Sequence, residues 1–173
     1  MSTRQIGITS LVFLLIYMIQ EAIISQFRLP GGGFSILIIF ALSWAIMSER
    51  EIAAVLGFSA GFLMDLSQNT SGPFGQWTLI MLLASYSISY LGYGDDNFRG
   101  NPISLVFTVA AAVVVIRIVY LILGLFLGSD IGSAWSVFLS LFSSAFWSAA
   151  IAPLLLPVVT RIHEALFDVK SRI

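Results

Sequence analysis

The chain has 173 residues, of which 58% are hydrophobic and only 10% are charged, and its formal net charge is −1. A water-soluble domain carries about 25% charged residues, so this composition excludes a surface made wholly for water and favours a protein that faces lipid. The balanced charge offers no basic surface for nucleic acid, and a chain without cysteine has no disulfide, thiol nucleophile or thiolate metal site.

Six apolar stretches follow one another along the chain, and four of them are close to or above the length of a helix that crosses a bilayer. The first, from Ile6 to about Ser25, is longer than the apolar core of a signal peptide and no A-x-A-like site follows it, so we expect it to be retained. The pattern predicts an all-α integral membrane protein, a single multipass domain over 1–173 that forms a bundle of six transmembrane helices. The predicted spans are about 6–25, 33–47, 52–66, 74–91, 103–127 and 134–159.

The second and third stretches are short, and they could instead form one re-entrant hairpin. The turn between them, Glu49-Arg50-Glu51, would then lie near the middle of the bilayer, where each charge costs at least ~2.5 kcal/mol. Two short full spans leave these charges in water. We therefore prefer six spans to four.

The distribution of basic residues predicts the orientation of the bundle. With the N-terminus inside, the inner segments carry six of the eight basic residues, the outer loops carry only Arg28, and Arg117 lies within the fifth span. Cytoplasmic segments are enriched in Lys and Arg, so both termini are predicted to be cytoplasmic. The loops are short, so any function must lie within the bundle, at its rims or on its lipid-facing surface. The six inner basic residues are Arg4, Arg50, Arg99, Arg161, Lys170 and Arg172.

Two rows of small side chains recur at a spacing of four, which places each row on one helix face. The row in the third span contains a GxxxG motif, which lets helix backbones approach closely in lipid. The row in the sixth span consists of serines, which hydrogen-bond within their own helix or to a neighbour. We interpret both rows as internal packing, with a partner helix or, for the serines, a polar substrate path as the alternative. The rows are Ala53, Gly57 and Gly61 in the third span, and Ser136, Ser140, Ser144 and Ser148 in the sixth.

Three ionisable residues inside the predicted spans are functional candidates because charge is costly in lipid. Arg117 lies close to the middle of the fifth span, Glu21 in the outer half of the first, and Asp65 at the outer end of the third. An unpaired arginine at that depth is unfavourable, so we predict that Arg117 pairs with Glu21 or Asp65. A structural ion pair is preferred to a proton relay, since the chain has one histidine.

The sequence contains no recognisable catalytic, cofactor-binding or metal site. His163 and Glu164 are adjacent, but no H-E-x-x-H zinc motif surrounds them. Ser71-Gly72-Pro73 is not a nucleophile elbow. We therefore predict that the protein is not an enzyme and needs no cofactor.

One stretch carries an ordered set of residues: a G-F-x-x-G run followed by D-L, a polar loop, and then P-hydrophobic-G before an apolar span. This order resembles the signature of the rod shape-determining protein MreD family. The loop between Asp65 and Gly75 is longer than in many members, and the Gly-x-Trp-x-Leu that begins at Gly75 resembles versions from high-GC Gram-positive bacteria. The matching residues are Gly57, Phe58, Gly61, Asp65, Leu66, Pro73 and Gly75.

The resemblance implies a role rather than a reaction. Members of this family are multi-pass proteins of the bacterial inner membrane that act with the bitopic protein MreC and, directly or indirectly, with the actin-like MreB and peptidoglycan synthases. We therefore expect a non-enzymatic membrane scaffold of the lateral wall synthesis machinery, embedded in the lipid bilayer and involved in cell-shape determination.

A second interpretation stays open, namely the substrate-binding membrane subunit of a small-solute, vitamin-type importer. Such subunits have a similar size and a six-helix architecture, and fold alone does not separate the two functions. Trp77, Asp65 and Glu21 could gather near the outer rim and form a pocket for the solute.

Overall fold

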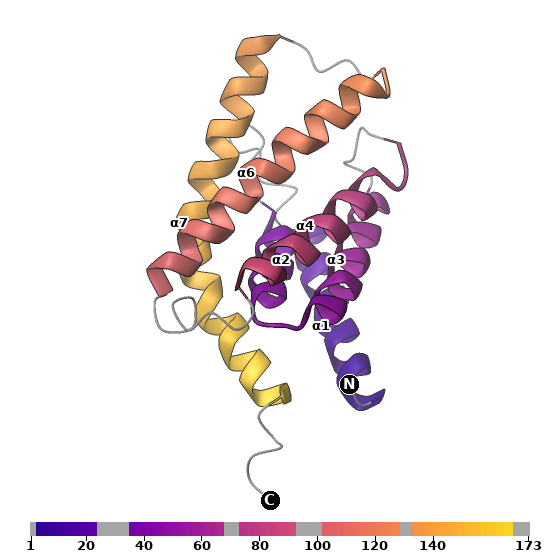
Figure 1. Ribbon diagram of the computed structural model, residues 1–173, viewed down its shortest axis with the longest axis vertical. Helices are drawn as coiled ribbons and strands as arrows, with labels where there is room; N and C mark the ends of the chain where they lie inside the picture. The colour runs from indigo at the N-terminus through magenta and orange to yellow at the C-terminus, as the bar shows by residue number, and fades with distance from the viewer. Residues whose placement is uncertain (1–2, 24–34, 68–72, 93–101, 129–132, 168–173) are drawn as a thin grey trace, which may run out of the picture.

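The computed structural model describes residues 3–23, 35–67, 73–92, 102–128 and 133–167, drawn as ribbon in Figure 1. Every regular element within these residues is a helix, which confirms the predicted all-α class. The helices are α1 (Thr3–Ala22), α2 (Ile36–Ile46), α3 (Arg50–Asp65), α4 (Gln76–Gly92), α6 (Pro102–Phe126) and α7 (Ala134–Phe167).

The helix boundaries differ most from the predicted spans at α2 and α7. α2 has only 11 residues, against the predicted 33–47, and at 1.5 Å per residue it is about 16 Å long. α7 has 34 residues and continues through Pro153 and Pro157 beyond the predicted end at 159. Each proline removes one backbone donor, but the turns on both sides keep α7 helical. The other four helices lie within a few residues of their predicted ranges.

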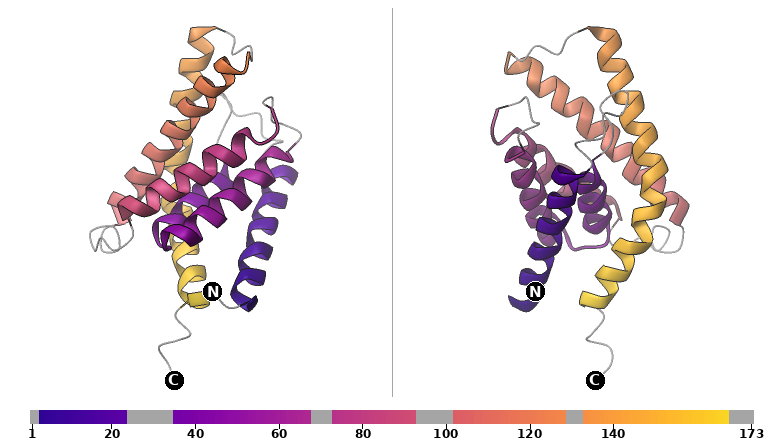
Figure 2. Two further views of the ribbon diagram at one scale, coloured as in Figure 1. Left: turned by 45° about the vertical axis from the view of Figure 1, so that its right-hand side comes forward. Right: turned by 180° about the vertical axis from the view of Figure 1, so that it is seen from behind.

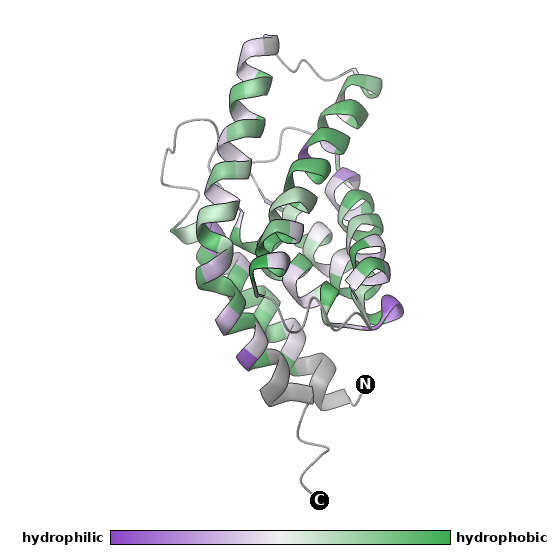
Figure 3. Cartoon of the chain, turned by 60° about the vertical axis from the view of Figure 1, so that its left-hand side comes forward, coloured by the Kyte–Doolittle hydropathy of each residue, from purple (hydrophilic) through white to green (hydrophobic). Residues whose placement is uncertain are grey.

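Two of the described helices, α6 and α7, are long and apolar enough to cross a membrane, over Ile103–Phe126 and Trp135–Ile162. Less than a third of each helix is buried inside the bundle, and Figure 3 shows that hydrophobic residues dominate both. Large apolar side chains are also exposed on α1, α3 and α4. A water-soluble protein rarely exposes so much apolar surface, so the fold indicates a membrane protein.

α2 lies at the centre of the bundle and contacts each of the five other described helices. All ten of its residues from Leu37 to Ile46 are buried. A helix that is apolar on every side must be enclosed by other apolar elements. Its Phe40 ring lies 5.4 Å from Phe13 of α1 and 5.3 Å from Trp44, between ring centroids. α2 therefore supplies the core on which the other helices assemble.

Four of the remaining described helices form two pairs around this core, and α1 packs against α2 and α3. α3 and α4 lie side by side as a hairpin, and α6 and α7 form a longer pair that extends past the hairpin at one end (Figures 1 and 2). The start of α1 and the end of α7 lie together at the opposite end of the molecule (Figure 1). The two ends of the described chain are therefore on one side of the bundle.

The short α2–α3 turn meets the last turn of α4. The Ser89 hydroxyl donates to the backbone oxygen of Ser48 at 2.6 Å, and the Arg50 guanidinium lies 4.3 Å from the centroid of the Tyr90 ring. Arg50 and the two glutamates on either side of it are exposed. The charged turn thus lies at the surface, where water can solvate it.

Candidate functional site

Gly57 and Gly61 bring α3 into close contact with α4. A Cβ atom added to Gly57 would lie 2.3 Å from the carbonyl oxygen of Met81, and one added to Gly61 would lie 2.5 Å from the Cα atom of Thr78. Real Cβ atoms do not approach other atoms so closely, so this helix spacing requires glycine. Ala53 is fully buried in the same row. The row packs inside the protein and offers no free surface to a partner helix.

Asp65 joins the end of α3 to the start of α4. Its carboxylate accepts hydrogen bonds from the backbone N–H groups of Trp77 (3.1 Å) and Thr78 (2.9 Å) and from the Thr78 hydroxyl (2.6 Å). The first N–H groups of a helix lack partners within the helix, and negative charge is favourable there. Asp65 therefore caps α4 from a neighbouring helix, which accounts for an acidic residue in this apolar hairpin.

The turn that leads into α4 depends on Pro73 and Gly75. Gly75 has a φ of 96°, in the left-handed region that residues with a Cβ atom seldom adopt. The N–H of Gln76 donates to the Pro73 carbonyl at 3.2 Å and the N–H of Leu79 donates to the Gly75 carbonyl at 3.0 Å, so the turn passes directly into the helix. Most residues of the Gly57–Gly75 motif thus have structural roles in one hairpin.

The other two motif residues, Phe58 and Leu66, are exposed on the surface of α3 and at its end. The Phe58 ring stacks on Phe62 with centroids 6.3 Å apart, and Phe62 meets Phe74 edge-on at 5.9 Å. All three rings are exposed, so the part of the chain that the structure describes leaves this aromatic strip uncovered. The strip is available to lipid or to another protein.

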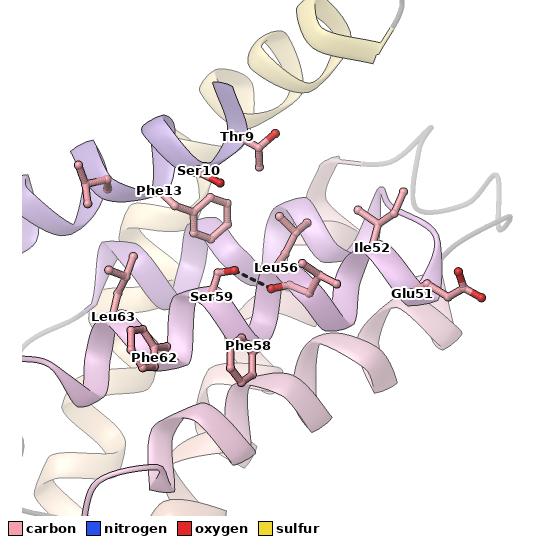
Figure 4. Close-up of a pocket in the computed structure, with 12 residues that line it drawn as sticks. Thr9, Ser10, Phe13, Glu51, Ile52, Leu56, Phe58, Ser59, Phe62 and Leu63 are labelled. Atoms are coloured by element: carbon pink, nitrogen blue, oxygen red, sulfur yellow. Dashed lines mark hydrogen bonds between the residues drawn. The ribbon is translucent and has the colours of Figure 1, made fainter. Parts of the chain in front are cut away.

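A groove of about 570 Å³ lies between α1 and α3, beside the aromatic strip (Figure 4). Its α3 lining extends from Glu51 to Leu63, more than three turns of that helix, whereas its α1 lining extends only from Thr9 to Leu14. The lining is mainly apolar, with Thr9, Ser10 and Ser59 as small polar exceptions. The Glu51 side chain lies at one end of the groove (Figure 4) and is exposed.

Arg117 does not form the predicted ion pair with Glu21 or Asp65. The Asp65 carboxylate is occupied by the start of α4, and Glu21 accepts a hydrogen bond from the Ser67 hydroxyl. No ion pair joins Arg117 to a described carboxylate, and its Nε is enclosed without a hydrogen-bond partner. Its guanidinium lies instead over the Trp77 ring, 5.9 Å from the centroid. Two of the three proposed rim residues are in contact, since the Asp65 carboxylate accepts a hydrogen bond from the backbone N–H of Trp77. Glu21 contacts Ser67, two residues after Asp65.

The contact between α4 and α6 contains a cluster that the sequence did not reveal as a unit. The Trp77 ring stacks on Tyr120 with centroids 4.4 Å apart, and Gln76 Nε2 donates to the backbone oxygen of Tyr120 at 2.8 Å. Arg117 lies three residues before Tyr120, a spacing that places both on one helix face. The Arg-x-x-Tyr spacing inside a predicted span was the one sequence feature that could have marked this cluster. Its contact with Gln76 and Trp77 is visible only in the tertiary structure.

The serine row of α7 enters the bundle only at one end. Ser136 is exposed and its hydroxyl donates to the backbone oxygen of Ser133 at 2.7 Å, whereas Ser144 and Ser148 are each 1% exposed. Ser140 is half-buried between them. Half of the row therefore packs inside the protein and half lies at its surface.

No three His, Asp or Glu side chains of the described residues gather into a group that would hold a metal ion. The side chains of His163 and Glu164 lie outside the described residues. The described geometry thus defines an all-α bundle of membrane type with two candidate sites, the α1–α3 groove and the α4–α6 cluster. Comparison of the chain with protein-family models, with curated proteins and with solved structures finds no match.

Proposed function

We propose that the chain is a non-enzymatic scaffold of the bacterial cell membrane that takes part in cell-shape determination by holding the lateral wall synthesis machinery together. The proposal has two supports. The Gly57–Gly75 motif resembles that of the MreD family, and the groove between α1 and α3 offers a place for a partner's helix. The partner is an MreC-like bitopic protein, through which the actin-like MreB and the peptidoglycan synthases join directly or indirectly.

We further propose that all six helices take part in a multi-pass bundle with both termini in the cytoplasm. An enclosed helix such as α2 needs no lipid contact along its whole length, so its 11 residues are compatible with a crossing segment. The ends of the described chain lie on one side of the bundle (Figure 1), as an even number of crossings requires. The excess of basic residues in the segments assigned to that side supports the orientation.

The groove is the observation that carries the scaffold proposal. Its lining on α3 extends over about 18 Å, which suits a helix laid alongside rather than a small solute. Close approach of helices in lipid needs small side chains, and Ser10 and Ser59 supply them. The exposed Glu51 carboxylate at the cytoplasmic end suits a Lys or Arg, which bitopic proteins place just inside the membrane.

The test combines depletion with co-purification. Depletion of the protein in a rod-shaped host should give round, widened cells before growth stops, and an MreC-like protein should co-purify with the full chain in mild detergent. Normal cell width after complete depletion, together with no recovery of an MreC-like protein, would overturn the proposal.

A second candidate function is the solute-binding subunit of a vitamin-type importer, and the α4–α6 cluster is the observation that favours it. Gln76 and Trp77 are both buried there with unpaired polar atoms, which a bound solute would satisfy. A ligand-dependent rise in melting temperature across a panel of vitamins would support this function. The scaffold predicts no such rise with vitamins that lack a phosphate group.

A further inference from the structure

The α4–α6 cluster contains three polar atoms that the described part of the chain leaves unsatisfied. Arg117 Nε, Trp77 Nε1 and Gln76 Oε1 are each enclosed, and each lacks a hydrogen-bond partner. Trp77 is 4% exposed and Gln76 is 6% exposed. Buried polar groups in native proteins are nearly always paired, so three unpaired atoms in one cluster indicate a bound group that completes them.

Arg117 defines the charge that such a group must carry. A guanidinium has five N–H donors and no acceptor, and it stays protonated in proteins. The carboxylate of Asp65, at the end of α3, already accepts three hydrogen bonds at the start of α4. Within the described part of the chain no ion pair involves Arg117, although an unpaired cation is unfavourable in lipid. None of the described carboxylates therefore supplies the counter-charge, and a bound anion is the group that would.

The cluster is held in a fixed shape before any ligand arrives. The stack of Trp77 on Tyr120 and the bond from Gln76 Nε2 to the Tyr120 backbone oxygen fix both α4 side chains against α6. That bond uses the donor side of the Gln76 amide and leaves Oε1 as an acceptor. Arg117 lies over the same Trp77 ring. Two donors and one acceptor are therefore held in one cluster, which lowers the cost of binding.

We propose that this cluster binds a phosphate group that carries a neighbouring hydroxyl. The phosphate oxygens pair with Arg117 and accept from Trp77 Nε1, and the hydroxyl donates to Gln76 Oε1. A carboxylate alone would leave Gln76 unsatisfied. Two sources supply this chemistry, the glycerophosphate headgroup of an anionic lipid and a soluble phosphate ester. The inference goes beyond the scaffold function and does not depend on it.

The first experiment measures lipid binding to the full chain by native mass spectrometry and by melting temperature. The wild type should retain phosphatidylglycerol in preference to phosphatidylcholine. Arg117→Gln and Trp77→Phe should each weaken retention about tenfold or more. Trp77→Phe keeps the ring that stacks on Tyr120, so it remains informative if Arg117→Gln does not fold. The matched control is Arg161→Gln, which removes an exposed arginine of α7 and should change nothing.

The second experiment separates the two sources. Glycerol 3-phosphate is added to the protein in phosphatidylcholine nanodiscs, with inorganic phosphate alongside. If glycerol 3-phosphate raises the melting temperature of the wild type and Arg117→Gln abolishes that rise, the site binds a soluble phosphate ester. If only phosphatidylglycerol raises the melting temperature, the site binds a lipid headgroup. The proposal is wrong if no phosphate source stabilises the wild type, or if Arg161→Gln weakens binding as much as the two cluster variants. Co-purification of an MreC-like protein is scored separately, so failure of this site and failure of the scaffold are distinguishable.

Discussion

Thr78 donates two hydrogen bonds to Asp65, one from its backbone N–H at 2.9 Å and one from its hydroxyl at 2.6 Å. Both reach the same carboxylate oxygen, Oδ2, and they join the last residue of α3 to the first turn of α4. The start of α4 is therefore stabilised by a residue outside that helix. These hydrogen bonds fix the position of α4 along α3, and in that position the glycines of α3 contact the backbone of α4.

Replacement of Asp65 by alanine should lower the free energy of unfolding by about 2 kcal/mol, because the start of α4 loses its acceptor for three hydrogen bonds. Thr78→Val removes only the hydroxyl bond and should cost about 1 kcal/mol. Thermal unfolding in detergent measures both. Glu51→Ala, which removes an exposed acid from the same helix, is the control and should have little effect. Equal losses for Asp65→Ala and Glu51→Ala would contradict the capping role.

Gly61→Ala should destabilise the protein by about 1–3 kcal/mol, because the new methyl group would overlap the backbone of Thr78 and force α3 away from α4. Alanine is the better helix former, so any loss reports packing rather than propensity. Ser59→Ala is the matched control on α3, since the Ser59 hydroxyl donates only to Val55 of its own helix at 2.8 Å. Reversible unfolding in detergent mixtures compares the two variants. A Gly61→Ala protein as stable as Ser59→Ala would show that the close contact is absent.

The orientation predicts which single cysteines a membrane-impermeant thiol reagent labels in intact cells. Cysteines placed at Ser71 and Ser129 should react, whereas cysteines at Asn97 and Glu51 should react only after the membrane is opened. Ser48, in the same turn as Glu51, is a poor position because it is 4% exposed. The chain has no cysteine of its own, so no background arises. Labelling of a cysteine at position 97 or 51 in intact cells would contradict the predicted orientation.

Ser59→Trp should fill the groove between α1 and α3 and reduce co-purification of the MreC-like partner about tenfold, without lowering the melting temperature. Glu51→Lys should weaken the same association by placing like charges together. Leu83→Trp changes an exposed apolar position of α4 outside the groove and serves as the control. If both groove variants co-purify with the partner as well as the wild type does, the groove is not the surface that binds the partner.

Composition and spacing predicted the helices because lipid imposes a simple requirement, namely that polar backbone groups be satisfied within each helix and that apolar side chains face outward. The GxxxG spacing also predicted a close helix contact. The same reasoning placed the start of α2 too early, because it did not identify Ser35 as the N-cap, whose hydroxyl oxygen accepts a hydrogen bond from the Ile38 N–H. It also ended α7 too early at its prolines.

The ion pair wrongly predicted for Arg117 shows why the side-chain contacts of the candidate site could not be predicted from sequence. Sequence identifies the ionisable residues and their approximate depth, and it makes Asp65 a plausible partner. It does not reveal that the N–H groups at the start of α4 compete for the same carboxylate and that they lie closer. Gln76 was missed for a related reason, because an amide carries no charge and only its contact with Tyr120 marks it.

By itself, then, the sequence determined that this is an all-helical, lipid-facing chain with a tightly packed glycine row, because these properties depend on side-chain chemistry repeated at local spacing. The tertiary structure alone decided that the glycine row faces α4 instead of a partner, that Asp65 caps α4 instead of pairing with Arg117, and that Trp77 stacks on Tyr120. Those outcomes depend on which helices become neighbours. Each polar group then pairs with whichever partner the packing brings within hydrogen-bond reach.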